Sequence, residues 1–152
     1  MDRYTSDEVC IVMTSADSGR YFPSNTPSLF TVLLNHPFDF LGQAEISLKQ
    51  IMFHTATPFN TRGDIIFDVY TPQCMGHHLC GSGEAGLLGR VITQVKKGST
   101  TVAAQFDGID YVKVKSSRID RFQICIKVIY PEKPKFLLSG VTHLSLSLRY
   151  NI

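Results

Sequence analysis

The chain has 152 residues and carries 15 Lys and Arg against 13 Asp and Glu, a formal net charge of +2. Its 43% hydrophobic and 18% charged residues exclude the composition of a disordered protein, and +2 is less than a strongly basic nucleic-acid protein would carry. No run approaches the roughly 20 apolar residues of a membrane span. The polar start MDRYTSDEVC is unlike a secretion signal. We expect a single domain over residues 1–152, neither secreted nor membrane-spanning.

Alternation of apolar and polar residues with a period of two predicts β-strands along most of the chain. The first strand falls within residues 1–23, where we expect an N-terminal arm followed by that strand. Within 44–53 the alternation slips by one residue between Leu48 and Ile51, which predicts a β-bulge. The alternating segments are 9–13, 30–34, 44–53, 65–69, 102–106, 112–114, 122–130 and 144–150.

Turn-forming residues separate these segments, including Asn35-His36-Pro37 and Ser139-Gly140, where we expect turns. Residues 71–98 are different: the first half contains the glycines of a long loop. The second half, 87–95, fits a helix by spacing, but its β-branched residues favour a strand. Eight or nine short strands predict an all-β fold, an antiparallel jelly-roll sandwich, although another Greek-key sandwich would give the same pattern.

The long loop in the first half of 71–98 contains two candidate motifs, one rich in glycine and one of possible metal ligands. Gly81-Ser82-Gly83-Glu84-Ala85-Gly86 matches G-x-G-x-x-G, but a dinucleotide site needs this turn between a strand and a helix. Four potential zinc ligands fall within seven residues of this loop, whereas the ligands of a zinc site are usually two pairs separated by a longer stretch of chain. We therefore treat zinc binding as a weaker alternative to a surface loop. These candidate metal ligands are Cys74, His77, His78 and Cys80.

Basic residues concentrate in the second half of the chain, where residues 61–152 hold twelve basic and seven acidic residues. A solvated strand face explains most such stretches, and a phosphate-facing surface is the functional alternative. The weak candidates for nucleic-acid binding are Lys113, Lys115, Arg118 and Arg121.

No arrangement of nucleophile, base and orienting group is visible in the sequence. The five histidines are scattered, apart from His77 and His78, and the 13 carboxylates form no obvious pair. We expect no enzyme activity, no cofactor and no small-molecule substrate. The four cysteines, Cys10, Cys74, Cys80 and Cys125, are too few for a disulfide scaffold, so we expect buried free thiols.

Three stretches together resemble a known family. The first combines 24–34, Pro37–Gly42 and Glu45–Leu48, and the second runs from Gly89 through Phe106 to Tyr111–Val114. The third combines Phe122–Ile124, Phe136–Gly140 and Leu146–Arg149. This order, covering residues 24–150, resembles the small jelly-roll, penton-like minor capsid protein of Polinton (Maverick) elements and related adintoviruses. Where the family has a basic end, this chain has Arg149 alone.

The resemblance implies a structural virion protein, assembled inside the host cell, of which five copies ring a fivefold vertex beside the major capsid protein. A sandwich without a catalytic arrangement acts through its surfaces. In this reading, the polar face carrying Ser145, Ser147 and Arg149 is free for a neighbouring subunit. Two alternatives stay open: a spike-head or lectin-like binding module, and a small metal-binding protein using the Cys74–Cys80 loop.

Overall fold

The computed structural model describes residues 6–40, 43–75, 86–106, 110–131 and 137–151. Within these ranges no helix has the length and apolar character needed to cross a membrane. The described residues form nine strands: β1 (Ser6–Thr14), β2 (Leu29–Asp39), β3 (Ala44–Thr55), β4 (Gly63–Tyr70), β5 (Leu87–Val95), β6 (Thr101–Gln105), β7 (Val112–Lys113), β8 (Arg118–Tyr130) and β9 (Leu138–Asn151).

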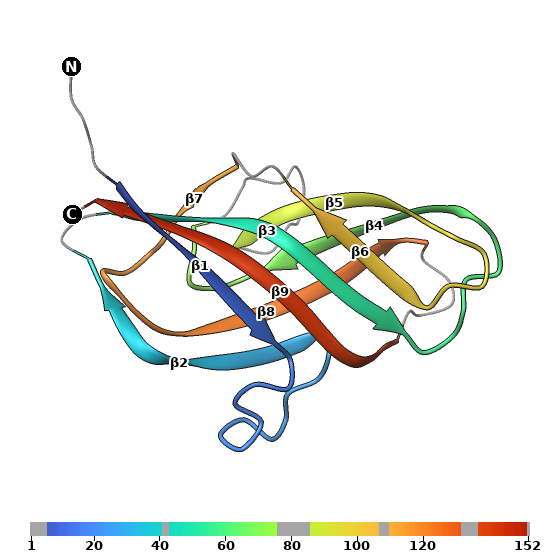
Figure 1. Cartoon of the computed structure of the whole chain (residues 1–152), viewed down its shortest axis with the longest axis horizontal. Helices are drawn as coiled ribbons and strands as arrows, with labels where there is room; N and C mark the ends of the chain where they lie inside the picture. Colours follow the sequence, from blue (N-terminus) through green and yellow to red (C-terminus); the bar gives the residue numbers. More distant parts are fainter. Residues whose placement is uncertain (1–5, 41–42, 76–85, 107–109, 132–136, 152) are drawn as a thin grey trace.

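The strands form two antiparallel sheets that lie one over the other (Figure 1). Sheet A has the order β1-β9-β3-β6, with the short β7 paired to β3, and sheet B has the order β2-β8-β4-β5. Successive strands along the chain alternate between the sheets from β1 through β4, so each connection crosses the sandwich. This order confirms the predicted jelly-roll.

The core lies between the sheets and is built from the inward residues of each alternating strand. Phe53 of β3 and Phe67 of β4 are both fully buried. Their rings meet edge to face across the two sheets, with centroids 5.0 Å apart and an interplanar angle of 87°. Phe30 and Ile124 lie opposite each other on β2 and β8 and are also buried. The inward faces therefore supply the apolar area that holds the sheets together.

Two sequence predictions about local structure are confirmed. The register of β3 against β9 shifts between Leu48 and Gln50, so the slip in the alternation corresponds to a bulge at Lys49. Residues 87–95 form β5, a strand rather than a helix. On this strand Val91 is buried and its neighbour Ile92 is exposed, as the pleat of a strand requires.

Two predicted turns are wrong. Residues 35–37 lie inside β2. There Leu33 pairs with Arg121 of β8 and Phe38 pairs with Ile119, so the four residues 34–37 of β2 face a single residue of β8. Ser139 and Gly140 lie inside β9. Residues 140–142 of β9 face the one residue of β3 that lies between Met52 and His54. Gly140 has a φ of +67°. In both places a bulge takes up the turn-forming residues without reversing the strand.

The segment after β4 is anchored by Gly86. Thr71 donates its backbone N–H to the carbonyl oxygen of Gly86 at 2.9 Å. Cys74 is fully buried and directs its thiol to the carbonyl oxygens of Thr71 and Gly86, at 3.5 and 3.6 Å. The expected buried free thiol is confirmed at Cys74, whereas Cys10 is exposed on β1 and Cys125 is half-buried.

Candidate interaction surfaces

The outer face of sheet A carries a row of alternating charges. Glu8 of β1 lies opposite Arg149 of β9, Arg149 lies opposite Glu45 of β3, and Glu45 lies opposite Lys113 of β7. Arg149 Nη2 donates to Glu45 Oε1 at 3.0 Å. Opposite charges in neighbouring registered positions stabilise the pairing of these four strands.

Tyr111 lies on this charged row. Its hydroxyl donates to Glu8 Oε1 at 2.6 Å, and Ser147 Oγ donates to the same oxygen at 2.5 Å. The guanidinium carbon of Arg149 lies 3.8 Å from the centroid of the Tyr111 ring, within cation–π range. The hydrogen bonds from Ser147 and Tyr111 hold the pKa of Glu8 below its usual value, and the charges of Lys49 and Arg149 add to this.

The expectation of a free polar face on β9 is therefore wrong at its centre. Ser147 is only 2% exposed, and Arg149 is engaged by Tyr111 and Glu45. Strand alternation showed that these side chains point outward, but it could not show that Tyr111 folds back over them. A neighbouring molecule on this face would meet the chain's own tyrosine.

The outer face of sheet B carries an apolar row instead. Ile66 of β4 lies opposite Ile92 of β5 on one side and opposite Tyr130 of β8 on the other. Ile92 is 67% exposed and Tyr130 is 54% exposed, and Ile66 is half-buried. Three registered apolar side chains on the outside of a sheet form a patch suited to contact with another protein. We call these three residues the sheet B patch.

Beside this patch lies a buried carboxylate. The side chain of Asp68 is 1% exposed although it points to the outer face of sheet B. Arg90 binds it with two parallel hydrogen bonds, Nε to Oδ1 at 2.7 Å and Nη2 to Oδ2 at 2.9 Å, and Tyr70 donates to it at 3.3 Å. These contacts raise the pKa of Arg90 and fix β5 to β4 next to Ile92.

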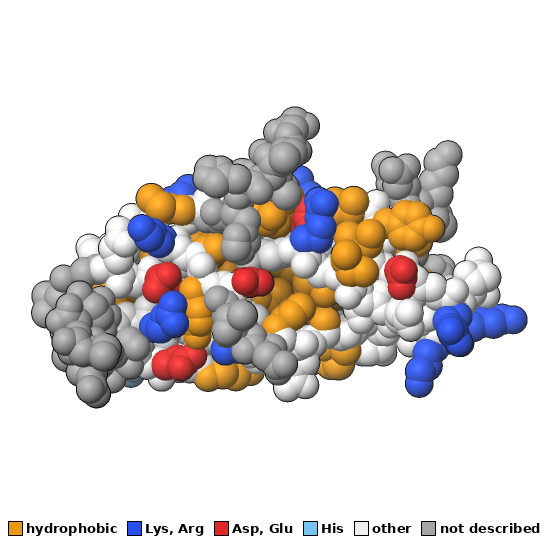
Figure 2. Space-filling model, turned by 90° about the horizontal axis from the view of Figure 1, so that it is seen from above, with side chains coloured by type: hydrophobic (Ala, Val, Ile, Leu, Met, Phe, Trp, Pro, Cys, Tyr) orange, Lys and Arg blue, Asp and Glu red, His pale blue; other side chains and the backbone are white. Residues whose placement is uncertain are grey.

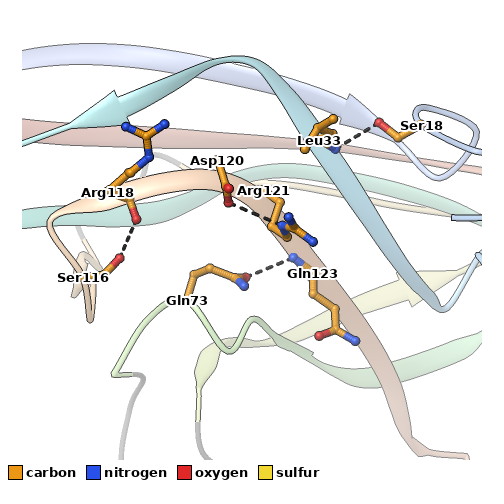
Figure 3. A network of polar contacts seen from close by, with 8 residues as sticks. All are labelled: Ser18, Leu33, Gln73, Ser116, Arg118, Asp120, Arg121 and Gln123. Carbon is orange, nitrogen blue, oxygen red and sulfur yellow. Dashed lines mark hydrogen bonds and ion pairs between the residues drawn. The ribbon is translucent and has the colours of Figure 1, made fainter. Parts of the chain in front are cut away.

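A groove of about 1200 Å³ lies along the side of the sandwich where β1 and β2 form the sheet edges. Val12 and Tyr21 line it and are 71% and 70% exposed; we call these two residues the β1 patch. Side chains cap the β2 edge. The backbone N–H and carbonyl of Thr31 form two hydrogen bonds with the side-chain amide of Asn25. The backbone N–H of Leu33 donates to Ser18 Oγ at 2.9 Å (Figure 3). Because capped edges resist strand addition, contact here would use side chains.

The four predicted nucleic-acid residues do not share one sheet, and Lys115 lies in the bend between β7 and β8. Lys113 is on β7, which pairs with sheet A, whereas Arg118 and Arg121 are on β8 of sheet B. Arg118 binds Asp39 at 3.2 Å, and Arg121 binds Asp120 at 3.4 Å; Figure 3 shows the second of these pairs.

Lys113 and Lys115 are exposed. In the same region the side chain of Gln73 caps β8 by accepting from the N–H of Gln123 at 3.0 Å (Figure 3). Nucleic-acid binding by this stretch stays a prediction. Two of its four basic side chains, those of Arg118 and Arg121, are paired with carboxylates.

Of the predicted metal ligands, the structure describes Cys74 alone, and its thiol is directed to backbone carbonyl groups. His77, His78 and Cys80 lie outside the described residues, as does most of the 81–86 glycine motif. Among the described residues no three His, Cys, Asp or Glu side chains come together in a way that could hold a metal ion.

The apolar patches had a signal in the sequence that alternation alone does not use. Pairs such as Ile65-Ile66, Val91-Ile92 and Ile129-Tyr130 place apolar residues next to each other in a strand. One member of such a pair must face outward. Three such pairs in strands that become neighbours indicate an exposed apolar row, but only the register aligns them.

The comparisons with known proteins locate this fold. No family model matches the sequence, and no curated protein matches it. Among solved structures the chain is similar to the crystal structure of the mavirus penton protein, with a TM-score of 0.65 and 8% sequence identity. The similarity covers 96% of this chain and 100% of that one. Since mavirus is a Polinton-like virus, the resemblance found in the sequence is confirmed at the level of the fold.

Proposed function

We propose that this chain is a non-enzymatic, penton-like minor capsid subunit that forms a homopentamer at the fivefold vertices of an icosahedral virion. The observation that carries the proposal is the end-to-end similarity of the sandwich to the mavirus penton protein at 8% identity. It agrees with the resemblance found in the sequence. The major capsid protein is the expected second partner, and the virion is the expected location.

A ring of identical subunits needs two different surfaces on each copy, because every contact in it is head to tail. The sandwich offers two exposed apolar patches at different places. The sheet B patch, Ile66, Ile92 and Tyr130, lies on the outer face of β5, β4 and β8. The β1 patch, Val12 and Tyr21, lies at the side formed by β1 and β2. We propose that the sheet B patch of one copy packs against the β1 patch of the next.

Exposed apolar anchors of this kind supply most of the affinity of a protein interface. Tyr130 and Tyr21 each combine a large apolar ring with a hydroxyl, a combination enriched in such contacts. Arg90 and Asp68 hold β5 rigidly beside Ile92, so the patch is ordered before contact and little entropy is lost on binding.

The first experiment is the solution mass of the purified chain, measured by light scattering behind a sizing column at several concentrations. We expect a species with five times the 17.0 kDa protomer mass, and its share of the protein should increase with concentration. A protomer mass at every concentration would contradict assembly of this chain by itself. The capsid role would then be tested by its presence in particles formed with the major capsid protein.

Two charge substitutions test the contact itself. Ile92→Asp and Val12→Asp place a carboxylate in either patch, and both positions are exposed enough to leave the fold intact. Each variant alone is expected to stay a protomer. An equal mixture keeps one good patch on each partner, so it should form a pair of twice the protomer mass and no ring.

The matched control is Gln105→Asp, an exposed position on β6 that should assemble like the unaltered chain. If the mixture of Ile92→Asp and Val12→Asp stays monomeric, the two patches do not contact each other. If either single variant assembles fully, its patch lies outside the interface.

A further inference from the structure

Three cations that form no ion pair with any described carboxylate lie together at one end of the sandwich. Arg62 precedes β4, and Lys96 and Lys97 follow β5. Backbone contacts fix the two loops on both sides of these residues. Gly63 lies opposite Val95 in the sheet, and Phe59 exchanges hydrogen bonds with the turn at 98–99, at 2.8 and 3.0 Å. The three cationic residues are therefore brought to the same end of the β4–β5 pair.

Four of the other basic residues that the structure describes are paired with carboxylates instead. Arg90, Arg118, Arg121 and Arg149 each bind a carboxylate within 3.4 Å. In the described part of the chain no ion pair joins Arg62, Lys96 or Lys97 to an acidic side chain. All three are exposed, and Figure 2 shows Lys and Arg side chains standing out at the end of the molecule where these loops lie.

The nearest acidic residue along these strands is Asp64, which is exposed on β4 opposite Gln94. One carboxylate beside three cations leaves a local excess of positive charge. Phe59, the aromatic residue of these loops, is 7% exposed, so it cannot stack on a base. The surface thus offers charge without an aromatic platform.

We propose that this cationic end, Arg62, Lys96 and Lys97, binds the phosphate backbone of nucleic acid without reading its sequence. Phosphate is the partner that three exposed cations fit, since each can neutralise one phosphate charge and release its counterions. Base recognition would need aromatic stacking or planar hydrogen bonding to base edges. The site does not depend on assembly, because all three residues belong to one protomer.

The expected signature is a salt dependence set by the number of phosphates neutralised. For three contacts, the slope of log K against log salt is about −2 on single strands and about −2.7 on duplex DNA. Affinity for one protomer would be weak, and a ring of five copies would multiply the contacts.

The test is fluorescence anisotropy of labelled single-stranded and duplex DNA of about 30 nucleotides over a range of salt. The test variant is Arg62→Gln/Lys96→Gln/Lys97→Gln. The matched control is Arg20→Gln/Lys113→Gln/Lys115→Gln, which removes the same charge from three exposed positions elsewhere. We expect the test variant to bind at least tenfold more weakly and its salt slope to fall towards zero, while the control keeps most of both.

Four results would overturn the proposal. The first is equal weakening in the two variants, which indicates a general effect of net charge. The second is loss confined to the control, which moves the site to the 113–121 stretch. The third is undetectable binding of either DNA at low salt. The fourth is displacement of DNA by polyaspartate at an equal concentration of charge, which points to an acidic protein partner.

Discussion

Substitution of Gly86 by alanine tests how the segment after β4 is held. Gly86 has a φ of +88°, and a Cβ placed there would lie well under 3.0 Å from the carbonyl oxygen of Thr71. The left-handed backbone alone costs an alanine about 1–2 kcal/mol. The collision is with backbone, so Thr71 must move and its hydrogen bond to Gly86 is strained, adding about 1–3 kcal/mol. We expect Gly86→Ala to destabilise the protein by about 3–4 kcal/mol.

Two other glycines separate these effects. Gly98 has a φ of +82° with open space around it, and Gly63 has neither a positive φ nor a close neighbour. Gly98→Ala should therefore show the backbone cost alone, about 1–2 kcal/mol. Gly63→Ala should be neutral or stabilising by up to about 1 kcal/mol, because it reduces the freedom of the unfolded chain.

The assay is urea unfolding of the three variants, followed by far-ultraviolet circular dichroism. The variants are compared only if the slope of the unfolding free energy against urea concentration stays the same, because the midpoint then reports stability. The expected order of loss is Gly86, then Gly98, then Gly63. If Gly86→Ala cost no more than Gly98→Ala, the close approach of residue 86 to Thr71 would contribute nothing to stability.

Three further outcomes are expected. Arg90→Ala leaves the buried carboxylate of Asp68 without its cation and should lower the midpoint of urea unfolding, although by less than for a fully buried pair because Arg90 is 45% exposed; an unchanged midpoint would show that the pair adds no stability. The lowered pKa of Glu8 contributes stability that is present above its unfolded pKa and is lost as pH falls through its folded pKa, so Glu8→Gln should reduce the drop in stability between about pH 6 and about pH 3. An unchanged pH profile would contradict the hydrogen bonds from Tyr111. Phe53→Ala should cost about 3–5 kcal/mol by thermal or urea unfolding, and a loss below about 1 kcal/mol would argue against a contact that joins the two sheets.

The strands were predictable because burial of one face leaves a period of two in the sequence. The slip after Leu48 predicted the bulge at Lys49, and β-branching identified β5. The turn residues at 35–37 and 139–140 misled, because a proline or glycine interrupts a ladder equally well at a turn or at a bulge. Which of the two occurs depends on the neighbouring strand.

The candidate surfaces were less accessible from the sequence. Adjacent apolar residues such as Val91-Ile92 show that one side chain faces outward, but the pairing of β5, β4 and β8 is needed to join Ile92, Ile66 and Tyr130. The basic stretch looked continuous along the chain, yet Arg118 and Arg121 meet carboxylates, one of them on another strand. Arg62 and Lys96 are far apart in sequence and neighbours only through the sheet.

By itself the sequence determined the class of the fold, since alternation and turn chemistry are local and each strand records its own buried face. It could not determine the order β1-β9-β3-β6 against β2-β8-β4-β5, because strand order is a property of long-range pairing that leaves no period in the chain. The same holds for Tyr111, whose position over Ser147 and Arg149 turns an outward polar face into a covered one. Only the tertiary structure decided which outward side chains remain free for a partner.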